Sequence, residues 1–388
     1  MADCVGVSTA IASHRLRPPR RFEDRPILVF WETTKACSLS CRHCRATALP
    51  TALPGELTTA EGLQLLDQLS EFGRPTPILV LTGGDCMARR DLLLLTARAR
   101  ELGIVVALSP SVTPRLTPES MSPFADLGVR SVSISLDGAC PATHDAVRGV
   151  SGHFDETLRA LEWLSEAGFK VQVNTTVMRA NVGELADIAA LLQRLAVPIW
   201  EVFFLVNVGR GADVAALNAE ENEQVCQFLY DASRYSVLVR TVEAPFFRRV
   251  VAERHERQEQ EEGSRGLQRG PIYDRLLGRL EELLGPPLNR PLSPSVSTRD
   301  GMGVLFVGHD GSVRPSGFLP LPLGNVKERG IADIYRHHQL LLRIRSAEFG
   351  GRCGRCAFRH LCGGSRARAY AVSGDPLGED PGCAYPAT

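Results

Sequence analysis

The sequence predicts an α/β fold, in which parallel strands alternate with helices, followed by a cysteine-rich C-terminal segment. From residue 26 to about residue 242, a short apolar strand, a loop and an amphipathic helix repeat about every 25 to 35 residues, the pattern of a parallel sheet covered by helices. Polar residues gather directly after the predicted strands. Seven of the eleven cysteines fall into two groups, one after the first strand and one near the C-terminus.

Six apolar runs predict strands, and a seventh run is a candidate. Six strand–helix units can close into a partial barrel or stay open as a sheet. The predicted strands are 27–31, 77–81, 104–108, 131–136, 170–175 and 200–206, with 237–242 as the candidate seventh.

The segments between the strands carry the signals that start and stop helices. Thr58 and Glu61 form a capping box, and Thr117 followed by Pro118 predicts a helix start with proline at the first helical position. Glycines mark the expected helix ends. They are Gly103, Gly128 and Gly168, after helices predicted at 91–102, 118–127 and 155–167.

The remaining chain divides into three segments around this repeat. We predict a mobile N-terminal arm at 1–22, the strand–helix repeat at 23–242, a helical insertion or connector at 243–298, and a separate C-terminal domain at 299–388. The connector is either a solvated linker or a lid over the sheet. The C-terminal domain begins with a hairpin, strands 304–307 and 312–314, and continues with one helix from 331 to about 345.

Composition excludes several functional classes. The net charge is zero at pH 7, so we expect neither nucleic acid nor an anionic membrane surface as a partner. No apolar run is long enough to span a membrane, and the first residues do not form a signal peptide, which predicts a cytoplasmic protein. Its cysteines are then reduced thiols or metal ligands. The isolated ones, Cys4, Cys86, Cys140 and Cys226, are expected to be ordinary residues.

The first cysteine group lies on the loop that leaves the first strand. Cys37, Cys41 and Cys44 have CxxxCxxC spacing, so three thiolates can surround one corner of a metal centre. A cubane iron–sulfur cluster usually takes four cysteines, and three leave one iron open. The alternative is a structural zinc loop, with His43 or a distant cysteine as the fourth ligand.

This spacing resembles the motif of the radical S-adenosylmethionine (radical SAM) superfamily, with His43 at the usually aromatic position. The resemblance implies a partial (β/α)6 TIM-like barrel and a 4Fe-4S cluster whose open iron binds SAM. It also implies reductive cleavage of SAM to a 5′-deoxyadenosyl radical that takes hydrogen from a substrate. A flavodoxin or ferredoxin is the expected reductant.

The resemblance also identifies candidate SAM contacts at strand ends. Gly83, Gly84 and Asp85 resemble the family's GGE motif, with a shorter carboxylate and with Cys86 where proline is common. Three further candidates follow later strands. Ser135 and Arg148 are the candidates for the SAM carboxylate, and Asn174 for the adenosyl group. The alternatives are a structural ion pair for Arg148 and a backbone cap for Asn174.

The second cysteine group, Cys353, Cys356, Cys362 and Cys383, supplies four thiolates, enough to close a 4Fe-4S cluster or a zinc-ribbon site. It resembles a reduced SPASM domain, the auxiliary-cluster domain of many radical SAM enzymes. Ser316 and Arg366 stand where fuller versions have cysteines. The resemblance therefore implies one auxiliary 4Fe-4S cluster, which takes up or relays an electron.

The C-terminal segment looks most like radical SAM enzymes of d-type haem and alternative haem b biosynthesis, which implies a tetrapyrrole side chain as substrate and an oxidative decarboxylation or similar reaction. The second hypothesis is a maturase of a ribosomally made peptide. The hypothesis from another functional class is a zinc-stapled binding module. No residue is assigned as a catalytic acid or base. The candidate partners for a tetrapyrrole propionate are Arg210, Arg248, Arg249, Arg366 and Arg368.

Overall fold

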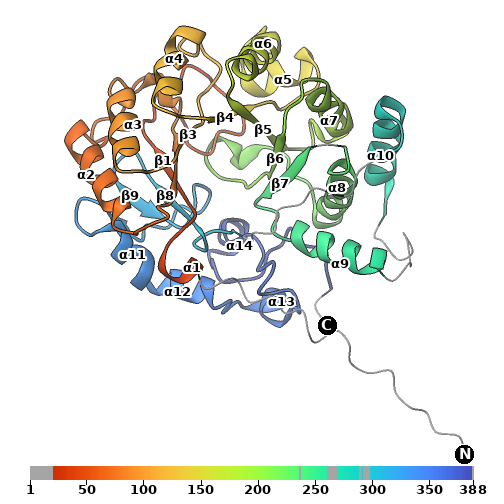
Figure 1. Cartoon of the computed structure of the whole chain (residues 1–388). Coiled ribbons are helices and arrows are strands. Elements are labelled where there is room, and N and C mark those ends of the chain that lie inside the picture. Colours follow the sequence, from red (N-terminus) through yellow and green to blue (C-terminus); the bar gives the residue numbers. More distant parts are fainter. Residues whose placement is uncertain (1–20, 236, 260–268, 288–290, 292–297, 387–388) are drawn as a thin grey trace, which may run out of the picture.

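The computed structural model describes residues 21–235, 237–259, 269–287, 291 and 298–386. Helices surround an inner set of strands, and the C-terminal helices lie together along one side (Figure 1). Of the predicted N-terminal arm, residues 1–20 lie outside the described part. Arg21 and Phe22 begin helix α1 (Arg21–Asp24), and Phe22 is buried.

The strand–helix repeat folds into one parallel sheet, as predicted. Strands β1 to β7 are neighbours in chain order, and every pair between them is parallel. The predicted strand positions agree with the observed ones to within about two residues. The strands are β1 (Leu28–Glu32), β2 (Ile78–Thr82), β3 (Val106–Leu108), β4 (Ser131–Ser135), β5 (Lys170–Val177), β6 (Ile199–Phe204) and β7 (Leu238–Val242).

The predicted start and stop signals of the helices are present. Thr58 and Thr117 each cap a helix through a capping box, and Gly103, Gly128 and Gly168 adopt positive φ just after helix ends. The helices of this part are α2 (Thr59–Ser70), α3 (Leu92–Glu101), α4 (Pro118–Asp126), α5 (Pro141–Arg148), α6 (His153–Glu166), α7 (Leu185–Arg194) and α8 (Ala219–Ala232), with 3-10 turns η1 (Cys86–Ala88), η2 (Val182–Glu184) and η3 (Gly209–Asp213).

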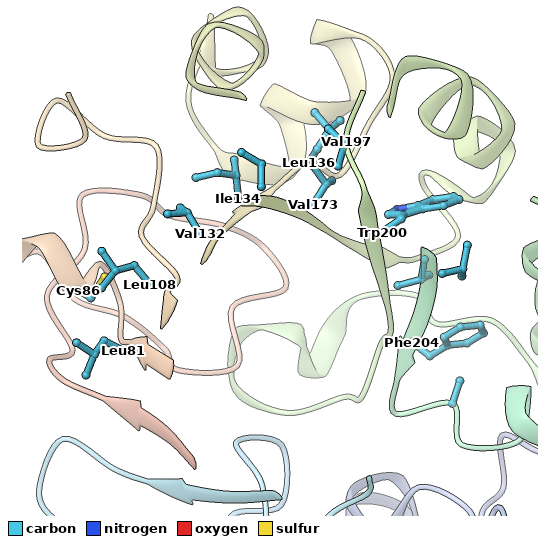
Figure 2. Close-up of a cluster of buried hydrophobic side chains, with 14 of the residues drawn as sticks. Leu81, Cys86, Leu108, Val132, Ile134, Leu136, Val173, Val197, Trp200 and Phe204 are labelled. Atoms are coloured by element: carbon cyan, nitrogen blue, oxygen red, sulfur yellow. The ribbon is translucent and has the colours of Figure 1, made fainter. Parts of the chain in front are cut away.

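The sheet has two different faces because side chains alternate along each strand. One face carries fully buried apolar residues such as Val173 and Trp200, which pack against the helices (Figure 2). The opposite, inner face carries partly exposed and mostly polar residues, including Ser135, Asn174 and Glu201. The outer face therefore supplies stability, and the inner face is available for function.

The two described helices of the connector pack against the helices that cover the sheet. Helix α10 (Pro271–Leu284) packs against α7 and α8, and helix α9 (Phe247–Glu259) packs against α8. The Tyr273 hydroxyl lies 2.9 Å from an Asp231 carboxylate oxygen, and Arg279 pairs with Asp187 at 2.7 Å. These contacts fix α10 on the outside of the sheet.

The C-terminal hairpin forms as predicted, but it joins the main sheet. Strand β8 (Val304–Val307) pairs with β1 in parallel, and β9 (Ser312–Arg314) and β10 (Gly324–Asn325) extend the sheet in antiparallel fashion. One sheet thus contains strands from both sides of residue 299, the predicted start of the C-terminal domain. That boundary stays a prediction. Helices α13 (Gly351–Arg355) and α14 (Arg366–Ser373) flank the second cysteine group.

The single helix predicted from 331 to about 345 is wrong. Two helices, α11 (Ile331–His337) and α12 (Gln339–Arg345), meet at His338, whose backbone is extended. The His338 ring accepts a hydrogen bond from the Leu340 N–H at 3.2 Å, so it caps the second helix. In the described part of the chain, no helix has both the length and the apolar character that a bilayer span requires.

Candidate active site

The first cysteine loop follows β1 and closes on itself. The Cys37 N–H donates to the Leu49 carbonyl at 2.7 Å, and the Leu49 N–H donates back to the Lys35 carbonyl at 3.0 Å. Cys37 and Cys41 are buried, whereas Cys44 is partly exposed. The Leu39 N–H lies 3.4 Å from the Cys37 sulfur. Such N–H contacts stabilise thiolates and tune iron–sulfur clusters.

Gly83 and Gly84 hold this loop against the end of β2. The Gly84 N–H donates to the Thr34 carbonyl at 2.8 Å, and the Asp85 N–H donates to the Ala36 carbonyl at 2.7 Å. A Cβ on Gly84 would lie 2.6 Å from the Ala36 oxygen, and one on Gly83 would lie 2.7 Å from the Thr34 oxygen. Glycine is therefore required for the close approach of two backbone segments.

The Asp85 side chain points into the protein. Its carboxylate accepts hydrogen bonds from the Thr113 hydroxyl at 2.9 Å and from the N–H groups of Met87 and Ser111 at 3.1 and 3.3 Å. Burial raises the pKa of this carboxyl group, and the hydrogen bonds act against the shift. Asp85 thus orders the loop after β3, where the Ser111 hydroxyl lies 3.7 Å from the Cys37 sulfur. Its contact with SAM stays a prediction.

Arg148 and Asp137 form a buried ion pair beside the first cysteine loop. The Arg148 Nη2 lies 2.6 Å from the Asp137 carboxylate, and its Nη1 lies 3.6 Å from the Cys41 sulfur. His43 Nε2 approaches the same carboxylate at 3.4 Å. Burial opposes the charge on Asp137, but Arg148 and His43 outweigh it and lower the pKa of Asp137. The ion pair of the structural alternative is present, and the contact of Arg148 with the SAM carboxylate stays a prediction.

A pair of buried histidines supports the helix that carries Arg148. The Asp137 N–H donates to His144 Nδ1 at 3.1 Å, so His144 must carry its proton on Nε2, which lies 2.8 Å from His153 Nδ1. His153 then donates from Nε2 to the Val112 carbonyl at 3.0 Å. Burial and the nearby Arg148 lower the pKa of His144 to about 3. Both rings are therefore neutral near pH 7.

Ser135 and Asn174 lie beside each other on the inner face of the sheet. They are register partners: Ser135 is the last residue of β4, and Asn174 lies in the middle of β5. The Asn174 amide oxygen accepts a hydrogen bond from the Gln172 side chain at 2.8 Å, and Gln172 also donates to Glu201 at 2.9 Å. The two predicted contacts are thus brought together, although the structure alone does not assign them to SAM.

The sequence analysis missed Glu201 and Arg240, which extend this polar line across β6 and β7. A charged residue inside an otherwise apolar strand, as in Ile199–Phe204, is the signal that identifies such an inward position. It also missed Glu32, which pairs with Arg45 at 3.1 Å and with His309 at 3.1 Å and so ties the first cysteine loop to the β8–β9 hairpin.

The four cysteines of the second group line one cavity. Arg352, Asp380 and Tyr385 lie among its other wall residues. Backbone N–H groups contact two of the sulfurs, from Gly364 to Cys362 and from Asp380 to Cys353, each at 3.4 Å. The four cysteines are Cys353, Cys356, Cys362 and Cys383.

Buried arginines surround this cavity and provide positive charge. The Arg366 Nη2 lies 3.6 Å from the Cys353 sulfur, and Arg299 donates to the Cys362 carbonyl at 3.2 Å. Burial lowers the pKa of Arg299 to about 9 and that of Arg248 to about 10. Arg248 Nη1 and Arg299 Nε are buried without a hydrogen-bond partner. Such uncompensated cations fit an anionic, thiolate-bound cluster at this place.

Two kinds of metal centre take four cysteine ligands. A zinc ion binds four ligands around one atom, whereas a cubane contacts each cysteine through a different iron. The four cysteines around this cavity supply the ligand count of either centre.

The five arginines predicted for a substrate carboxylate are engaged within the protein. Arg210 donates to the carbonyls of Cys41 and Ala48, and Arg249 pairs with Glu223 and Glu253. The others lie near the second cysteine group. Arg248 donates to the Thr298 carbonyl, Arg366 donates to the Gly378 carbonyl at 2.6 Å, and Arg368 pairs with Asp380 at 3.1 Å.

The isolated cysteines in the described part have no metal-ligand set. Cys86 is fully buried in the outer core, and burial raises the pKa of its thiol (Figure 2). Cys226 is buried on α8, and Cys140 lies near Glu184. Ser316, at a place where a further cysteine was considered, accepts a hydrogen bond from the Phe318 N–H at 3.3 Å. Cys4 lies outside the described residues.

Comparison with known proteins identifies relatives along most of the chain. Residues 31–192 match the model of the Radical SAM superfamily. An AdoMet-dependent heme synthase of Oleidesulfovibrio alaskensis is 36% identical over 96% of this chain and 92% of its own length. A pre-heme d1 synthase of Dinoroseobacter shibae is 29% identical over 94% and 88%. The mycofactocin maturase MftC of Mycobacterium tuberculosis is 30% identical over 93% and 83%.

Solved structures share the fold at low sequence identity. Streptococcus suis SuiB bound to its precursor peptide SuiA superposes with a TM-score of 0.67 at 14% identity, covering 93% of this chain and 76% of that chain. The predicted fold class, a partial barrel with a C-terminal SPASM-like part, is therefore confirmed.

Proposed function

This chain belongs to the radical SAM superfamily and is an enzyme, and we propose that its substrate is a tetrapyrrole whose propionate side chain it decarboxylates oxidatively. The observation that carries this proposal is the similarity to an AdoMet-dependent heme synthase, which covers 96% of this chain. The zinc-stapled binding module is excluded by the family.

The family implies a 4Fe-4S cluster and SAM, and the cysteine loop after β1 fits them. Cys37, Cys41 and Cys44 would hold three irons and leave the fourth for SAM. When bound, SAM and the cluster would supply a 5′-deoxyadenosyl radical, formed with methionine by one-electron cleavage, that takes one hydrogen atom from the propionate side chain. Loss of CO2 and one electron from that side chain then leaves a vinyl group.

The chain's own residues position these groups. Gly83 and Gly84 fix the cysteine loop against β2, and Arg148 places positive charge beside the Cys41 thiolate. Ser135, at the end of β4, and its register partner Asn174 on β5 lie on the inner face, where they would contact SAM. Asp85 would act through the backbone that it orders.

The second cysteine group would hold an auxiliary 4Fe-4S cluster. Four thiolates leave no open iron, so this site is suited to taking up or relaying the electron that the substrate loses. The buried Arg248, Arg299 and Arg366 would balance its negative charge. A flavodoxin or ferredoxin would supply the electron for SAM cleavage, and the cytoplasm is the compartment that offers both.

The test is an anaerobic assay of the reconstituted enzyme with iron coproporphyrin III, SAM and a reductant. The expected product is lighter by the elements of formic acid for each converted side chain, with 5′-deoxyadenosine formed alongside. If 5′-deoxyadenosine formed without any change in the porphyrin, the tetrapyrrole proposal would be wrong.

A peptide maturase is the second candidate, because the mycofactocin maturase relative is 30% identical over 93% of this chain. Co-expression with a precursor peptide encoded near the gene distinguishes the two. A mass change in the peptide, with the porphyrin unchanged, would favour the maturase.

A further inference from the structure

Four polar side chains form one row across the inner face of the sheet. The strand register pairs Ser135 with Asn174, Asn174 with Glu201, and Glu201 with Arg240, so the row crosses β4, β5, β6 and β7. Its first two members are the proposed SAM contacts. Its last two, Glu201 and Arg240, have no role in the proposal above.

Alternation along the strands places Glu201 and Arg240 on the inner face. Trp200, Val202 and Val239, their neighbours in sequence, are fully buried in the outer core against the helices. Glu201 and Arg240 point the opposite way and are partly exposed. They can therefore meet a molecule bound on the inner face.

The Arg240 guanidinium is available for a ligand. Its cross-strand neighbour Glu201 accepts a hydrogen bond from Gln172 at 2.9 Å, and Gln172 also donates to Asn174. Burial raises the pKa of Glu201 and the charge of Arg240 opposes that rise, but Arg240 makes no hydrogen bond or close ion pair with any described residue. The five arginines first considered for a propionate, in contrast, all make hydrogen bonds or ion pairs within the protein.

The chemistry of the Arg240 guanidinium favours an anionic ligand. Burial is the largest influence on Glu201 and raises its pKa, while Arg240 and the Gln172 hydrogen bond act against that shift. The fork of an arginine binds a carboxylate through two parallel hydrogen bonds.

An aromatic surface lies two residues farther along β6. The Phe203 ring centroid lies 6.0 Å from that of Phe318, which follows the C-terminal hairpin. The Arg45 guanidinium lies 5.9 Å from the Phe318 ring centroid and 4.6 Å from that of Phe306. Phe203 and Phe318 are partly exposed. Phe203 lies two residues from Glu201 on β6 and so shares the inner face with Arg240. Aromatic faces on the same face as an arginine suit a flat ring system that carries carboxylates.

We propose that Arg240 is the receptor for a substrate carboxylate on the inner face of the sheet, with Gln172 and Glu201 fixing its surroundings and Phe203 and Phe318 contacting the macrocycle. This inference rests on the proposed tetrapyrrole substrate. A carboxylate held at Arg240 would place the ring between the aromatic residues and the SAM end of the row, at Ser135 and Asn174.

The test is an absorbance titration of the reconstituted enzyme with iron coproporphyrin III and, separately, with its tetramethyl ester. Replacing Arg240 by glutamine should weaken binding of the acid about tenfold to a hundredfold, because a charge-assisted hydrogen-bonded contact is lost. Binding of the ester should not differ between the wild type and the variant. Arg240→Lys should restore part of the affinity for the acid.

Arg159→Gln is the matched control, since it removes an exposed arginine on α6. Iron and sulfide contents and the melting temperature show whether each variant is folded. Equal affinity of wild type and Arg240→Gln for the acid would overturn the carboxylate receptor while leaving the tetrapyrrole proposal standing. A wild-type enzyme that binds neither porphyrin would overturn both.

Discussion

The Arg148 guanidinium lies between the carboxylate of Asp137, at 2.6 Å, and the sulfur of Cys41, at 3.6 Å. One buried cation thus joins the loop after β4 to the cysteine loop after β1. Removing one partner of a buried ion pair leaves an uncompensated charge, so the pair couples the stability of the fold to the geometry of the cluster site.

Arg148→Gln should destabilise the apoprotein by about 3–5 kcal/mol and reduce iron retention at the first site. The free energy of unfolding in denaturant, together with iron content, measures both effects. Adding Asp137→Asn should recover part of the loss, because no buried charge is then left unpaired. The exposed pair of Arg98 and Asp67 is the control, and Arg98→Gln should cost at most about 1 kcal/mol. An equally small loss for Arg148→Gln would contradict the buried-pair argument.

Gly84→Ala should displace the cysteine loop, because the new methyl group would lie 2.6 Å from the Ala36 oxygen and 2.7 Å from the Lys35 oxygen. Both contacts are with backbone oxygens, which can move only at a large cost in free energy. We therefore expect a lower melting temperature and loss of iron from the first site. Gly278→Ala, at an exposed position of α10, meets no atom within 4 Å and should stabilise by about 0.5–1 kcal/mol. Normal iron content in Gly84→Ala would show that the loop tolerates the contact.

Iron and acid-labile sulfide should report two cubane clusters, about eight irons per chain after anaerobic reconstitution. Replacing Cys37, Cys41 and Cys44 by alanine should reduce this to about four irons, and so should replacing Cys353 and Cys356. Cys140→Ala, an isolated cysteine, should leave it unchanged. Zinc in place of iron at the second group would contradict the auxiliary cluster.

The double variant Cys353→Ala/Cys356→Ala also tests the electron-accepting role of the second group. With the acceptor lost, formation of the vinyl product should fall to background, because the substrate radical has nowhere to pass its electron. Product is measured by mass spectrometry against the Cys140→Ala control. Unchanged turnover in the double variant would show that the second group is structural only.

Stability should fall in weak acid because His144 is buried as a neutral ring. Its folded pKa, about 3, lies below the unfolded value of about 6.5, so the unfolded chain binds more protons between these values. The stabilisation is complete above about pH 6.5 and decreases as the pH falls, by about 2 kcal/mol at pH 5. His153, whose pKa burial also lowers, adds to the effect.

The free energy of unfolding of the apoprotein, measured between about pH 8 and pH 5, checks this expectation. His144→Gln should flatten the profile, whereas His337→Gln, at an exposed histidine, should not. A wild-type profile that is already flat would mean that His144 is protonated without cost.

The sequence by itself determined the local features of this protein. The alternation of strands and helices, the capping residues Thr58 and Thr117, and the spacing of Cys37, Cys41 and Cys44 depend on residues only a few positions apart. Local propensity and periodicity therefore predict them. The same local spacing carried the resemblance to the radical SAM superfamily.

Only the tertiary structure decided what those features contact. It placed β8 beside β1, turned the Asp85 carboxylate into the protein, and put Glu201 and Arg240 in one row with Ser135 and Asn174. It also showed that the arginines first considered for a substrate are engaged elsewhere. These outcomes depend on strand register and on packing between distant segments, and a shift of one residue would reverse which side chains face inward.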